Sequence, residues 1–281
     1  MTPPLVHVLA TDHPARSPRA RLVRDLVDRL ARNGVTAEVD DPDRHAHDLS
    51  VPEPLADLYV LTSGTPTALS LAGALDAVGA RIVNPYPVAA ACRDKIVQTR
   101  TLAAAGVPVP QSWLVTDPIQ VAPHLADGPL IVKDPRGSRG RGLHVLHEQA
   151  GLADLDQEPW LVMRYHPPEG PDLKLYRIGE EVFCVERPFP ARTLRETRGR
   201  LVTVSAEVEA IVRRCGDAFG IEVYGVDVER HEGRLWVVDM SAFPGFTGVP
   251  EAGRRIADVV TERLHDDVSR VPRARVTAVT P

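Results

Sequence analysis

The sequence predicts an α/β protein with a doubly wound parallel sheet at its N-terminus and antiparallel α+β structure after it. Over the first 84 residues, short apolar runs alternate with segments of helical periodicity, which is typical of a parallel sheet covered by helices. After residue 110, apolar runs come in pairs joined by short glycine-containing segments, which is typical of antiparallel hairpins. At 281 residues, the chain is long enough for two domains, or for one large domain with a lid.

Two helices and four strands are expected in the N-terminal part. Apolar residues recur at the helical period over residues 19–31, and the pair Asn33-Gly34 after them is a helix stop. A second helix is expected over residues 67–78, after a turn at residues 63–66. The expected strands are residues 5–10, 35–39, 55–61 and 81–84. No Gly-x-Gly-x-x-Gly follows the first strand, so the sequence gives no indication of a dinucleotide site.

The rest of the chain is expected to combine three helices with antiparallel strands. The helices are expected over residues 94–104, 205–219 and 252–264, and glycines end the first two. Four strands are expected over residues 112–115, 129–133, 143–146 and 160–165. Two hairpins are expected, one joining residues 173–178 to 182–186 and the other joining 222–229 to 235–240.

Composition excludes several classes of function. The net charge of −5 argues against nucleic acid as a partner, because such binding needs a concentrated positive field. No apolar run approaches the roughly 20 residues needed to cross a membrane, and the first residues do not resemble a signal peptide. Three widely spaced cysteines without a Cys-x-x-Cys pair indicate reduced thiols, and therefore a cytoplasmic location.

The chain contains only three lysines, Lys95, Lys133 and Lys174, among 33 basic residues, so the other thirty are arginines. A compact ammonium and a planar guanidinium are not interchangeable where a point charge must sit on a phosphate oxygen. Each lysine lies in a segment that is typical of phosphate binding, so the three positions are candidates for nucleotide contacts.

A glycine- and arginine-rich loop at residues 136–142 follows Lys133. Glycines allow backbone N–H groups to approach an anion, and the arginines add positive charge. The loop joins two expected strands, so it is not a Walker loop, which opens a helix. Two interpretations stay open at this point: a lid over polyphosphate, or a flexible basic hairpin tip.

Asp227 and Asp239 lie within apolar runs on the two strands of the last expected hairpin. Buried carboxylates are costly unless they meet a cation or a metal. Carboxylates from neighbouring strands, with waters and phosphate oxygens, are the ligands that Mg²⁺ takes beside ATP. The alternative is that each aspartate caps a turn or pairs with an arginine.

These segments, in this order, resemble the ATP-grasp superfamily over residues 84–260. The motifs that carry the resemblance are Cys92-Arg-Asp-Lys95, Gly106-Val-Pro-Val-Pro110, Ile131-Val-Lys133, the 137–142 loop, Asp172-Leu-Lys174, Gly225-Val-Asp227 and Val238-Asp239-Met-Ser241. Two branches are similar to this chain: the ribosomal-protein-glutamate-ligase and glutathione-synthetase-like group, and the inositol-trisphosphate kinases. The loop has Arg139 and Arg141 in place of the histidine motif of the kinases, which favours the ligases.

The resemblance implies an ATP-grasp fold in three parts. Residues 1–84 would form the N-terminal doubly wound α/β domain, residues 85–165 a lid subdomain, and residues 166–281 an antiparallel-sheet α+β subdomain for metal and substrate. It also implies ATP and Mg²⁺ as cofactors, small-molecule carboxylate and amine substrates such as amino acids or peptides, and a homodimer. In the ligases, ATP phosphorylates a carboxylate and an amine then displaces the phosphate.

The resemblance also implies a role for each candidate residue. Lys95 and Lys133 would hold the α- and β-phosphates, Lys174 would contact phosphate or substrate, and Arg187 would steady the transferring phosphoryl group or the oxyanion. The remaining assignments are the lid over the γ-phosphate (Gly137, Ser138, Arg139, Gly140), the adenine edge (Met163), the ribose (Asp172 or Glu169) and Mg²⁺ (Asp227, Asp239, Ser241). Ser241 stands where the family has asparagine, and Met163 where it has a glutamate or glutamine beside adenine, so a non-catalytic ATP-binding protein stays as an alternative. The strand pair that carries Lys174 and Arg187 keeps a small-molecule kinase as another alternative.

Overall fold

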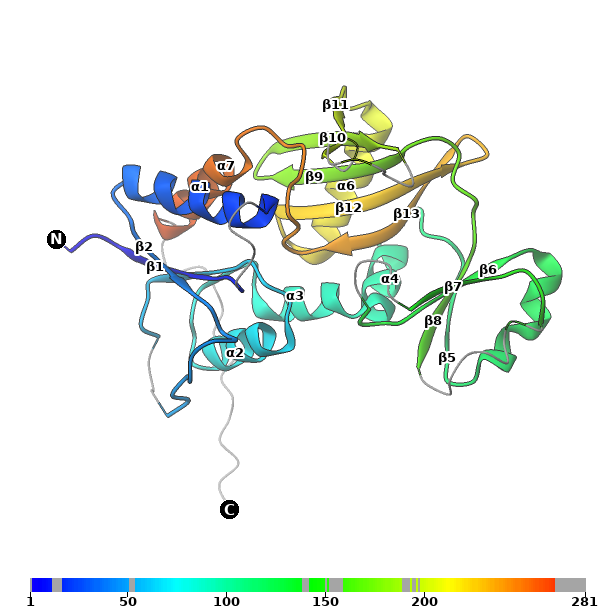
Figure 1. The fold of residues 1–281 in the computed structure, drawn as a ribbon, viewed down its shortest axis with the longest axis horizontal. Coiled ribbons are helices and arrows are strands. Elements are labelled where there is room, and N and C mark those ends of the chain that lie inside the picture. The colour runs from blue at the N-terminus through cyan, green and yellow to red at the C-terminus, as the bar shows by residue number, and fades with distance from the viewer. Residues whose placement is uncertain are drawn as a thin grey trace, which may run out of the picture.

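The computed structural model describes residues 2–11, 17–50, 54–137, 142–149, 151, 159–188, 193, 196 and 198–265. It contains three sheets, of which the first is parallel and the other two are antiparallel (Figure 1). The predicted order of a parallel region followed by antiparallel regions is therefore confirmed.

The parallel sheet is formed by β1 (Leu5–Leu9), β2 (Thr36–Asp40), β3 (Leu58–Leu61) and β4 (Ile82–Val83), in the order β2-β1-β3-β4. Helix α1 (Pro18–Arg32) begins where the Ser17 side chain accepts a hydrogen bond from the Ala20 N–H, and Thr65 caps α2 (Pro66–Ala77) in the same way. Helices cover both faces, because α1 and α2 pack in separate apolar clusters on opposite sides of these strands (Figure 1).

Two helices connect this sheet to the next. Helix α3 (Tyr86–Arg93) was not predicted, although the proline in its first turn is well tolerated at that position. Helix α4 (Lys95–Ala104) starts immediately afterwards. The Asp94 carboxylate accepts hydrogen bonds from Ile96 N at 3.0 Å and Val97 N at 3.3 Å. This cap fixes the start of the helix, and therefore the position of its first residue, Lys95.

The second sheet is small and lies at one end of the molecule (Figure 1). It consists of β5 (Ser112–Val115), β6 (Leu130–Lys133), β7 (Leu143–Leu146) and β8 (Trp160–Arg164), in the order β5-β8-β6-β7. A 3₁₀ segment, η1 (Pro118–Asp127), was not predicted. Arg164 holds this region together, since its guanidinium donates to the carbonyls of His124 at 3.1 Å and Gly128 at 2.6 Å.

The third sheet has five strands in the order β11-β10-β9-β12-β13. They are β9 (Asp172–Ile178), β10 (Glu181–Arg187), β11 (Arg200–Val202), β12 (Val223–His231) and β13 (Arg234–Ser241), with α6 (Ala206–Phe219) packed against the sheet. The short strand β11 was not predicted, because it has only three residues and pairs with one neighbour, β10, at the edge of the sheet.

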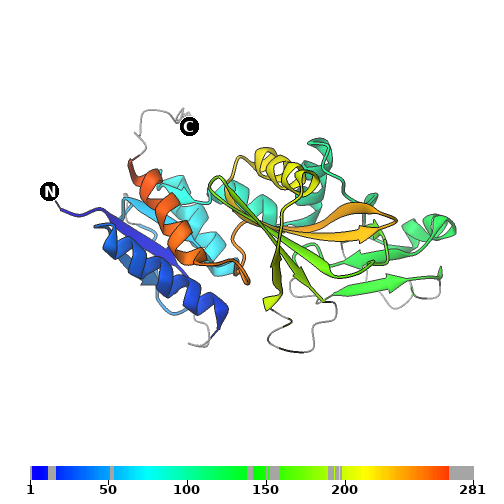
Figure 2. The same cartoon turned by 90° about the horizontal axis from the view of Figure 1, so that it is seen from above.

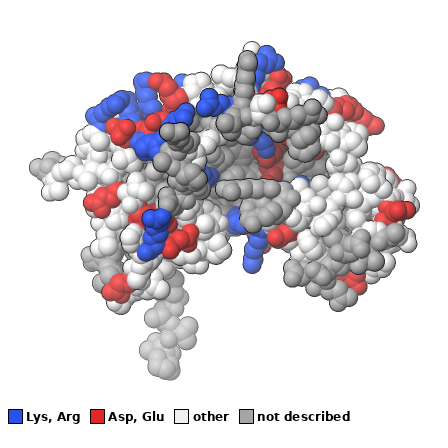
Figure 3. All heavy atoms as spheres, in the orientation of Figure 1, with Lys and Arg blue, Asp and Glu red and all other residues white. Residues whose placement is uncertain are grey.

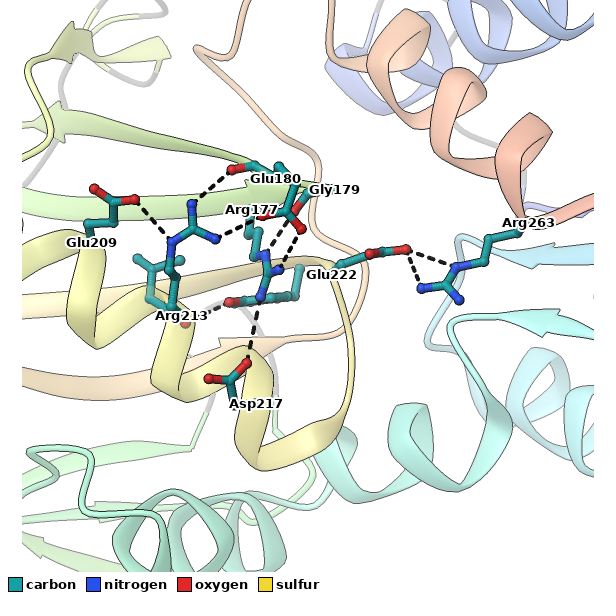
Figure 4. Close-up of polar contacts among 10 residues, drawn as sticks. Arg177, Gly179, Glu180, Glu209, Arg213, Asp217, Glu222 and Arg263 are labelled. Carbon is teal, nitrogen blue, oxygen red and sulfur yellow. Dashed lines mark hydrogen bonds and ion pairs between the residues drawn. The ribbon is translucent and has the colours of Figure 1, made fainter. Parts of the chain in front are cut away.

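Arginines tie α6 to the β9–β10 hairpin (Figure 4). The guanidinium of Arg213 contacts Glu209 at 3.0 Å and Glu180 at 3.2 Å, and Arg177 donates to the Gly179 carbonyl at 2.8 Å. A guanidinium suits these contacts because it has several donors in a fixed fork. Arg177 and Arg213 therefore serve the structure of this region.

The last helix, α7 (Ala252–His265), returns to the N-terminal sheet and packs beside α1 (Figure 2). A Cβ atom on Gly253 would lie 2.7 Å from the Leu22 carbonyl oxygen, so glycine permits the close approach of the two helices. Arg29 and Asp258 form an ion pair across them at 2.9 Å. The first and third sheets thereby share one apolar core.

Two expectations from composition concern thiols and membranes. Cys92, Cys184 and Cys215 are buried and unbonded to one another, and burial raises the pKa of the Cys92 thiol to about 12, which makes it a poor nucleophile. Among the helices in the described ranges, none combines the length and apolarity that crossing a membrane requires.

Candidate active site

The three lysines, from α4, β6 and β9, converge on the part of the β12–β13 hairpin that contains Asp227, Val238 and Asp239. Lys95 Nζ lies 3.6 Å from an Asp239 carboxylate oxygen, and Lys174 forms an ion pair with Asp227. Lys133 Nζ donates a hydrogen bond to the Val238 carbonyl at 3.1 Å. Basic and acidic side chains meet in the hollow near the centre of the face drawn in Figure 3. The predicted grouping of lysines and aspartates therefore exists.

A β-bulge places the two aspartates. Asp227 of β12 lies directly opposite Asp239 of β13, whereas the next pair is Val228 with Val237, so Val238 is an extra residue on β13. A bulge redirects the neighbouring side chain and leaves one residue unpaired. The carbonyl of that residue is the acceptor for Lys133. The bulge therefore positions both the Asp239 side chain and the backbone carbonyl that Lys133 contacts.

Burial dominates the electrostatics of the site. Lys133 is only 7% exposed, and burial lowers the pKa of its ammonium, with the Asp239 carboxylate opposing the shift. Burial raises the pKa of Asp239, and here Lys95 opposes the shift. Glu229, a residue that the sequence analysis did not single out, behaves in the same way, because burial raises its pKa and the Lys133 ammonium opposes this shift. Such groups are typical of functional sites.

A pocket of about 220 Å³ lies beside the aspartates. Its lining includes Lys174, Tyr176, Arg187, Asp227, Asp239 and Ser241, together with residues from the following loop. Arg187 donates to the Tyr176 hydroxyl at 3.0 Å and to the Thr247 carbonyl at 3.1 Å. Its buried Nε finds no acceptor among the described residues, so the guanidinium retains a donor for a ligand.

The lid residues lie partly outside the described residues. The carbonyl of Gly137 accepts hydrogen bonds from Lys95 Nζ at 3.0 Å and from Arg93 at 3.5 Å, so the start of the loop contacts Lys95. Ser138, Arg139, Gly140 and Arg141 fall outside the described residues. The backbone N–H of Lys95 also donates a hydrogen bond to the Pro135 carbonyl, just before this loop, at 2.9 Å.

The residues expected beside adenine and ribose are more dispersed. Met163 is 2% exposed within β8, opposite Ser112 and Ile131. Asp172 lies opposite Arg187 on the same sheet, and burial raises its pKa while Lys174 opposes. Glu169 instead has its carboxylate 3.7 Å from His231 Nδ1. Asp172 is therefore the one of the two that lies near Lys174 and Asp227.

The donor set fits Mg²⁺ bound together with a nucleotide. Asp227 and Asp239 are opposite each other on paired strands and offer carboxylate oxygens, and Ser241 offers a hydroxyl. Mg²⁺ commonly takes one or two carboxylates and completes its coordination shell with phosphates and water. Within the described residues, no group of three or more His, Cys, Asp and Glu side chains is arranged to hold a metal alone. Two carboxylates without a third agree with a metal that needs phosphate ligands.

Two buried amides lie near this site, Asn84 and Gln98, which are 4% and 2% exposed, and the sequence analysis did not single out Gln98. Gln98 lies on the buried side of α4, where a polar side chain needs a partner. That signal was present in the helical pattern, although the partner, the backbone of β13, was not predictable from it.

No protein-family model matches this chain. It is similar to a probable alpha-L-glutamate ligase of Sodalis glossinidius, with 28% identity over 192 residues, which cover 62% of this chain and 64% of that protein. A probable alpha-L-glutamate ligase of Haemophilus influenzae is 27% identical over 201 residues, covering 66% of each chain. The chain thus spans about two thirds of the length of these relatives.

Solved structures match nearly the whole chain. A RimK domain ATP-grasp protein from Sphaerobacter thermophilus has a TM-score of 0.73 at 19% identity and covers 90% of this chain and 98% of its own. The D-cycloserine synthetase DcsG has a TM-score of 0.72 at 19% identity, covering 92% and 99%. The ATP-grasp ligase PsnB, solved with a minimal precursor, Mg and ADP, has a TM-score of 0.69 at 19% identity, covering 92% and 97%.

The chain has the fold of these solved ATP-grasp proteins, in agreement with the resemblance stated from its motifs. Among the proteins to which it is similar are a RimK domain ATP-grasp protein and probable alpha-L-glutamate ligases.

Proposed function

We propose that this protein is an ATP- and Mg²⁺-dependent carboxylate–amine ligase that works through an acyl phosphate. The observation that carries the proposal is the convergence of Lys95, Lys133 and Lys174 on Asp227 and Asp239, beside a pocket that contains Arg187. The relatives are named as ligases, and PsnB was solved with Mg and ADP, which supports use of the same cofactors.

Each basic residue has a proposed task in the first step, in which a carboxylate oxygen attacks the γ-phosphorus and the bond to ADP breaks. Lys95 and Lys133 bind the nucleotide phosphates and exchange their present partners, Asp239 and backbone carbonyls, for phosphate oxygens. Arg187, with its free Nε donor, neutralises charge on the transferring group. Bound Mg²⁺, held by Asp227, Asp239 and Ser241, would supply charge neutralisation of the phosphate oxygens.

The second step needs positioning more than a protein nucleophile. The amine nitrogen attacks the acyl carbon, the carbon–oxygen bond breaks, and phosphate leaves with the former carboxylate oxygen while the nitrogen loses a proton. Holding the two reactants in contact supplies much of the rate. Lys174 contacts the oxyanion or the phosphate, and we place the start of the lid, at Gly137, over the γ-phosphate to exclude water.

The charge of the pocket favours a carboxylate substrate over an inositol polyphosphate. Among its lining residues, Lys174 and Arg187 are balanced by Asp227 and Asp239, and Lys174 is already paired with Asp227. A polyphosphate needs a clear excess of cations. Arg200 of the edge strand β11 adds no excess charge, because it is paired with Glu186 at 2.7 Å. An amino acid or a peptide, as in the precursor complexes of PsnB, suits this pocket better.

The test is incubation with ATP, Mg²⁺ and pooled amino acids and dipeptides, with product detection by mass spectrometry. The ligase predicts ADP and free phosphate in equal amounts, together with a new amide. A phosphorylated product without free phosphate would instead establish a kinase. If no substrate turnover is lost in the Asp239→Ala variant, the protein is instead a non-catalytic ATP-binding protein. A homodimer stays a prediction that analytical ultracentrifugation can check.

A further inference from the structure

Strand β13, which carries Asp239 and Ser241, is an edge strand, so one side of its backbone lacks a strand neighbour among the described residues. Backbone groups at an edge must find other partners when they are shielded from water. Here the partners come from other parts of the chain. Val237 N donates to the Pro108 carbonyl at 2.7 Å, and the Val238 carbonyl accepts from Lys133 at 3.1 Å.

Gln98 takes the place of a neighbouring strand at Met240, the residue between Asp239 and Ser241. Its Nε2 donates to the Met240 carbonyl at 2.6 Å, and its Oε1 accepts from the Met240 N–H at 2.9 Å. A residue of a neighbouring antiparallel strand would likewise offer Met240 one donor and one acceptor. The second Nε2 hydrogen goes to the Cys92 carbonyl at 2.7 Å, which ties the amide to the end of α3.

A second buried amide fixes the strand on the other side of Ser241. Asn84 Nδ2 donates to the Ala242 carbonyl at 2.5 Å and to the Val223 carbonyl at 2.6 Å, where β12 begins. Both neighbours of Ser241 are therefore held by side chains from outside the sheet. Neither amide lines the pocket or contacts the aspartate carboxylates.

The same helix carries a nucleotide lysine. Lys95 and Gln98 are three residues apart on α4, so they project from the same side of the helix. Lys95 meets the Asp239 carboxylate at 3.6 Å, and Gln98 holds the next residue of β13 by its backbone. Any displacement of α4 therefore shifts a phosphate contact and the metal-binding strand together.

We propose that Gln98 is a positioning residue for the metal-binding strand, which sets the placement of Asp239 and Ser241 and couples it to Lys95. This inference rests on the proposed function, in which these two side chains bind Mg²⁺ with the nucleotide. It predicts that loss of the amide weakens the Mg²⁺-dependent part of nucleotide binding far more than the metal-independent part.

The test measures ADP affinity by isothermal titration calorimetry, with and without Mg²⁺, for wild type, Gln98→Met and Gln98→Glu. Gln98→Met removes all three hydrogen bonds. Gln98→Glu keeps the shape and the acceptor for Met240 N, but turns a carboxylate towards two carbonyls. Leu102→Val is the matched control, because Leu102 lies one turn further on the same helix and is 1% exposed in the core. Thermal unfolding establishes that each variant is folded.

We expect both Gln98 variants to reduce the Mg²⁺-dependent gain in ADP affinity tenfold or more, the range seen when partners that orient metal ligands are removed, with less than a threefold change in metal-free affinity. Leu102→Val should keep the wild-type gain. A gain within twofold of wild type in both Gln98 variants would overturn the inference and leave the proposed function intact. Failure of both variants to fold would also overturn it, since Gln98 would then serve the fold. Absence of any Mg²⁺-dependent gain in wild type would contradict the proposed function itself, and the inference with it.

Discussion

Replacing Lys133 with arginine keeps the charge of the buried cation and changes only its shape. Lys133 is 7% exposed and places one Nζ–H on the bulge carbonyl of Val238 at 3.1 Å. A guanidinium is larger and planar, and cannot occupy the volume of a single ammonium. We therefore expect the new side chain to leave the Val238 carbonyl and to reach the phosphates at a different angle.

The expected loss follows from one charge-assisted contact. A hydrogen bond to a charged group contributes about 1.5–3 kcal/mol. At about 1.4 kcal/mol per tenfold, Lys133→Arg should weaken ADP–Mg²⁺ binding roughly 10- to 150-fold. Crowding the site should also destabilise the nucleotide-free protein by about 1–3 kcal/mol, the usual cost of adding atoms to a packed interior.

Lys133→Met separates charge from packing in the same assay. Because burial lowers the pKa of Lys133 below its ordinary value of 10.5, the charged lysine destabilises the folded state at neutral pH, and its stability rises as the pH rises from the folded pKa towards 10.5. Methionine removes that penalty at the expense of one hydrogen bond. We expect an unfolding temperature equal to or above that of wild type, without its pH dependence in this window, and the weakest nucleotide binding of the series.

Calorimetric titration with ADP–Mg²⁺ and thermal unfolding measure both effects. Arg200→Lys is the control, because it makes a conservative basic substitution in an exposed ion pair with Glu186, and exposed pairs contribute little. Nucleotide affinity of Lys133→Arg within threefold of wild type would refute the reasoning that a compact point charge is required at this position.

Three further predictions test the site and its surroundings. Asp239→Ala should abolish the Mg²⁺-dependent part of ADP binding, measured by calorimetry, whereas Asp258→Ala, in an ion pair between α1 and α7, should leave it unchanged. Arg164→Met should destabilise the small sheet by about 2–4 kcal/mol, because it leaves the carbonyls of His124 and Gly128 without their donor. Amide hydrogen exchange should then become faster in β5 to β8, whereas β9 to β13 should stay protected. His166 stacks on Trp236 with ring centroids 4.4 Å apart, and burial lowers its pKa, so the folded state prefers the neutral ring and loses stability as the pH falls below 6.5. His166→Phe should keep the stack and reduce the fall in unfolding temperature between pH 7.5 and pH 5.5, and an unchanged fall would exclude His166 as its source.

The sequence was most informative where local chemistry decides structure. The helix stop at Asn33-Gly34 and the hairpin glycines are local signals, and the helices and strands they bound lie within a few residues of expectation. For helix α3, a proline pair favours a break in one context and a first turn in another, and only the packing of Ala89 and Cys92 decides between them.

Contacts between distant segments were the harder part of the site. The order of motifs was enough to associate Lys95, Lys133 and Lys174 with Asp227 and Asp239, because several motifs in a family's order constrain a fold. The bulge at Val238 and the amide contacts of Gln98 depend on the register of β13 and on its position at a sheet edge. Neither is encoded within a short window of sequence.

The central claim, an acyl phosphate formed from a substrate carboxylate, is tested most directly by isotope transfer. The pooled assay first identifies a carboxylate and amine pair, and the carboxylate is then labelled with ¹⁸O. The mechanism predicts one labelled oxygen in each phosphate released, because the carboxylate oxygen that attacks ATP leaves with the phosphate when the amine displaces it. Amide formation that releases only unlabelled phosphate would contradict the account.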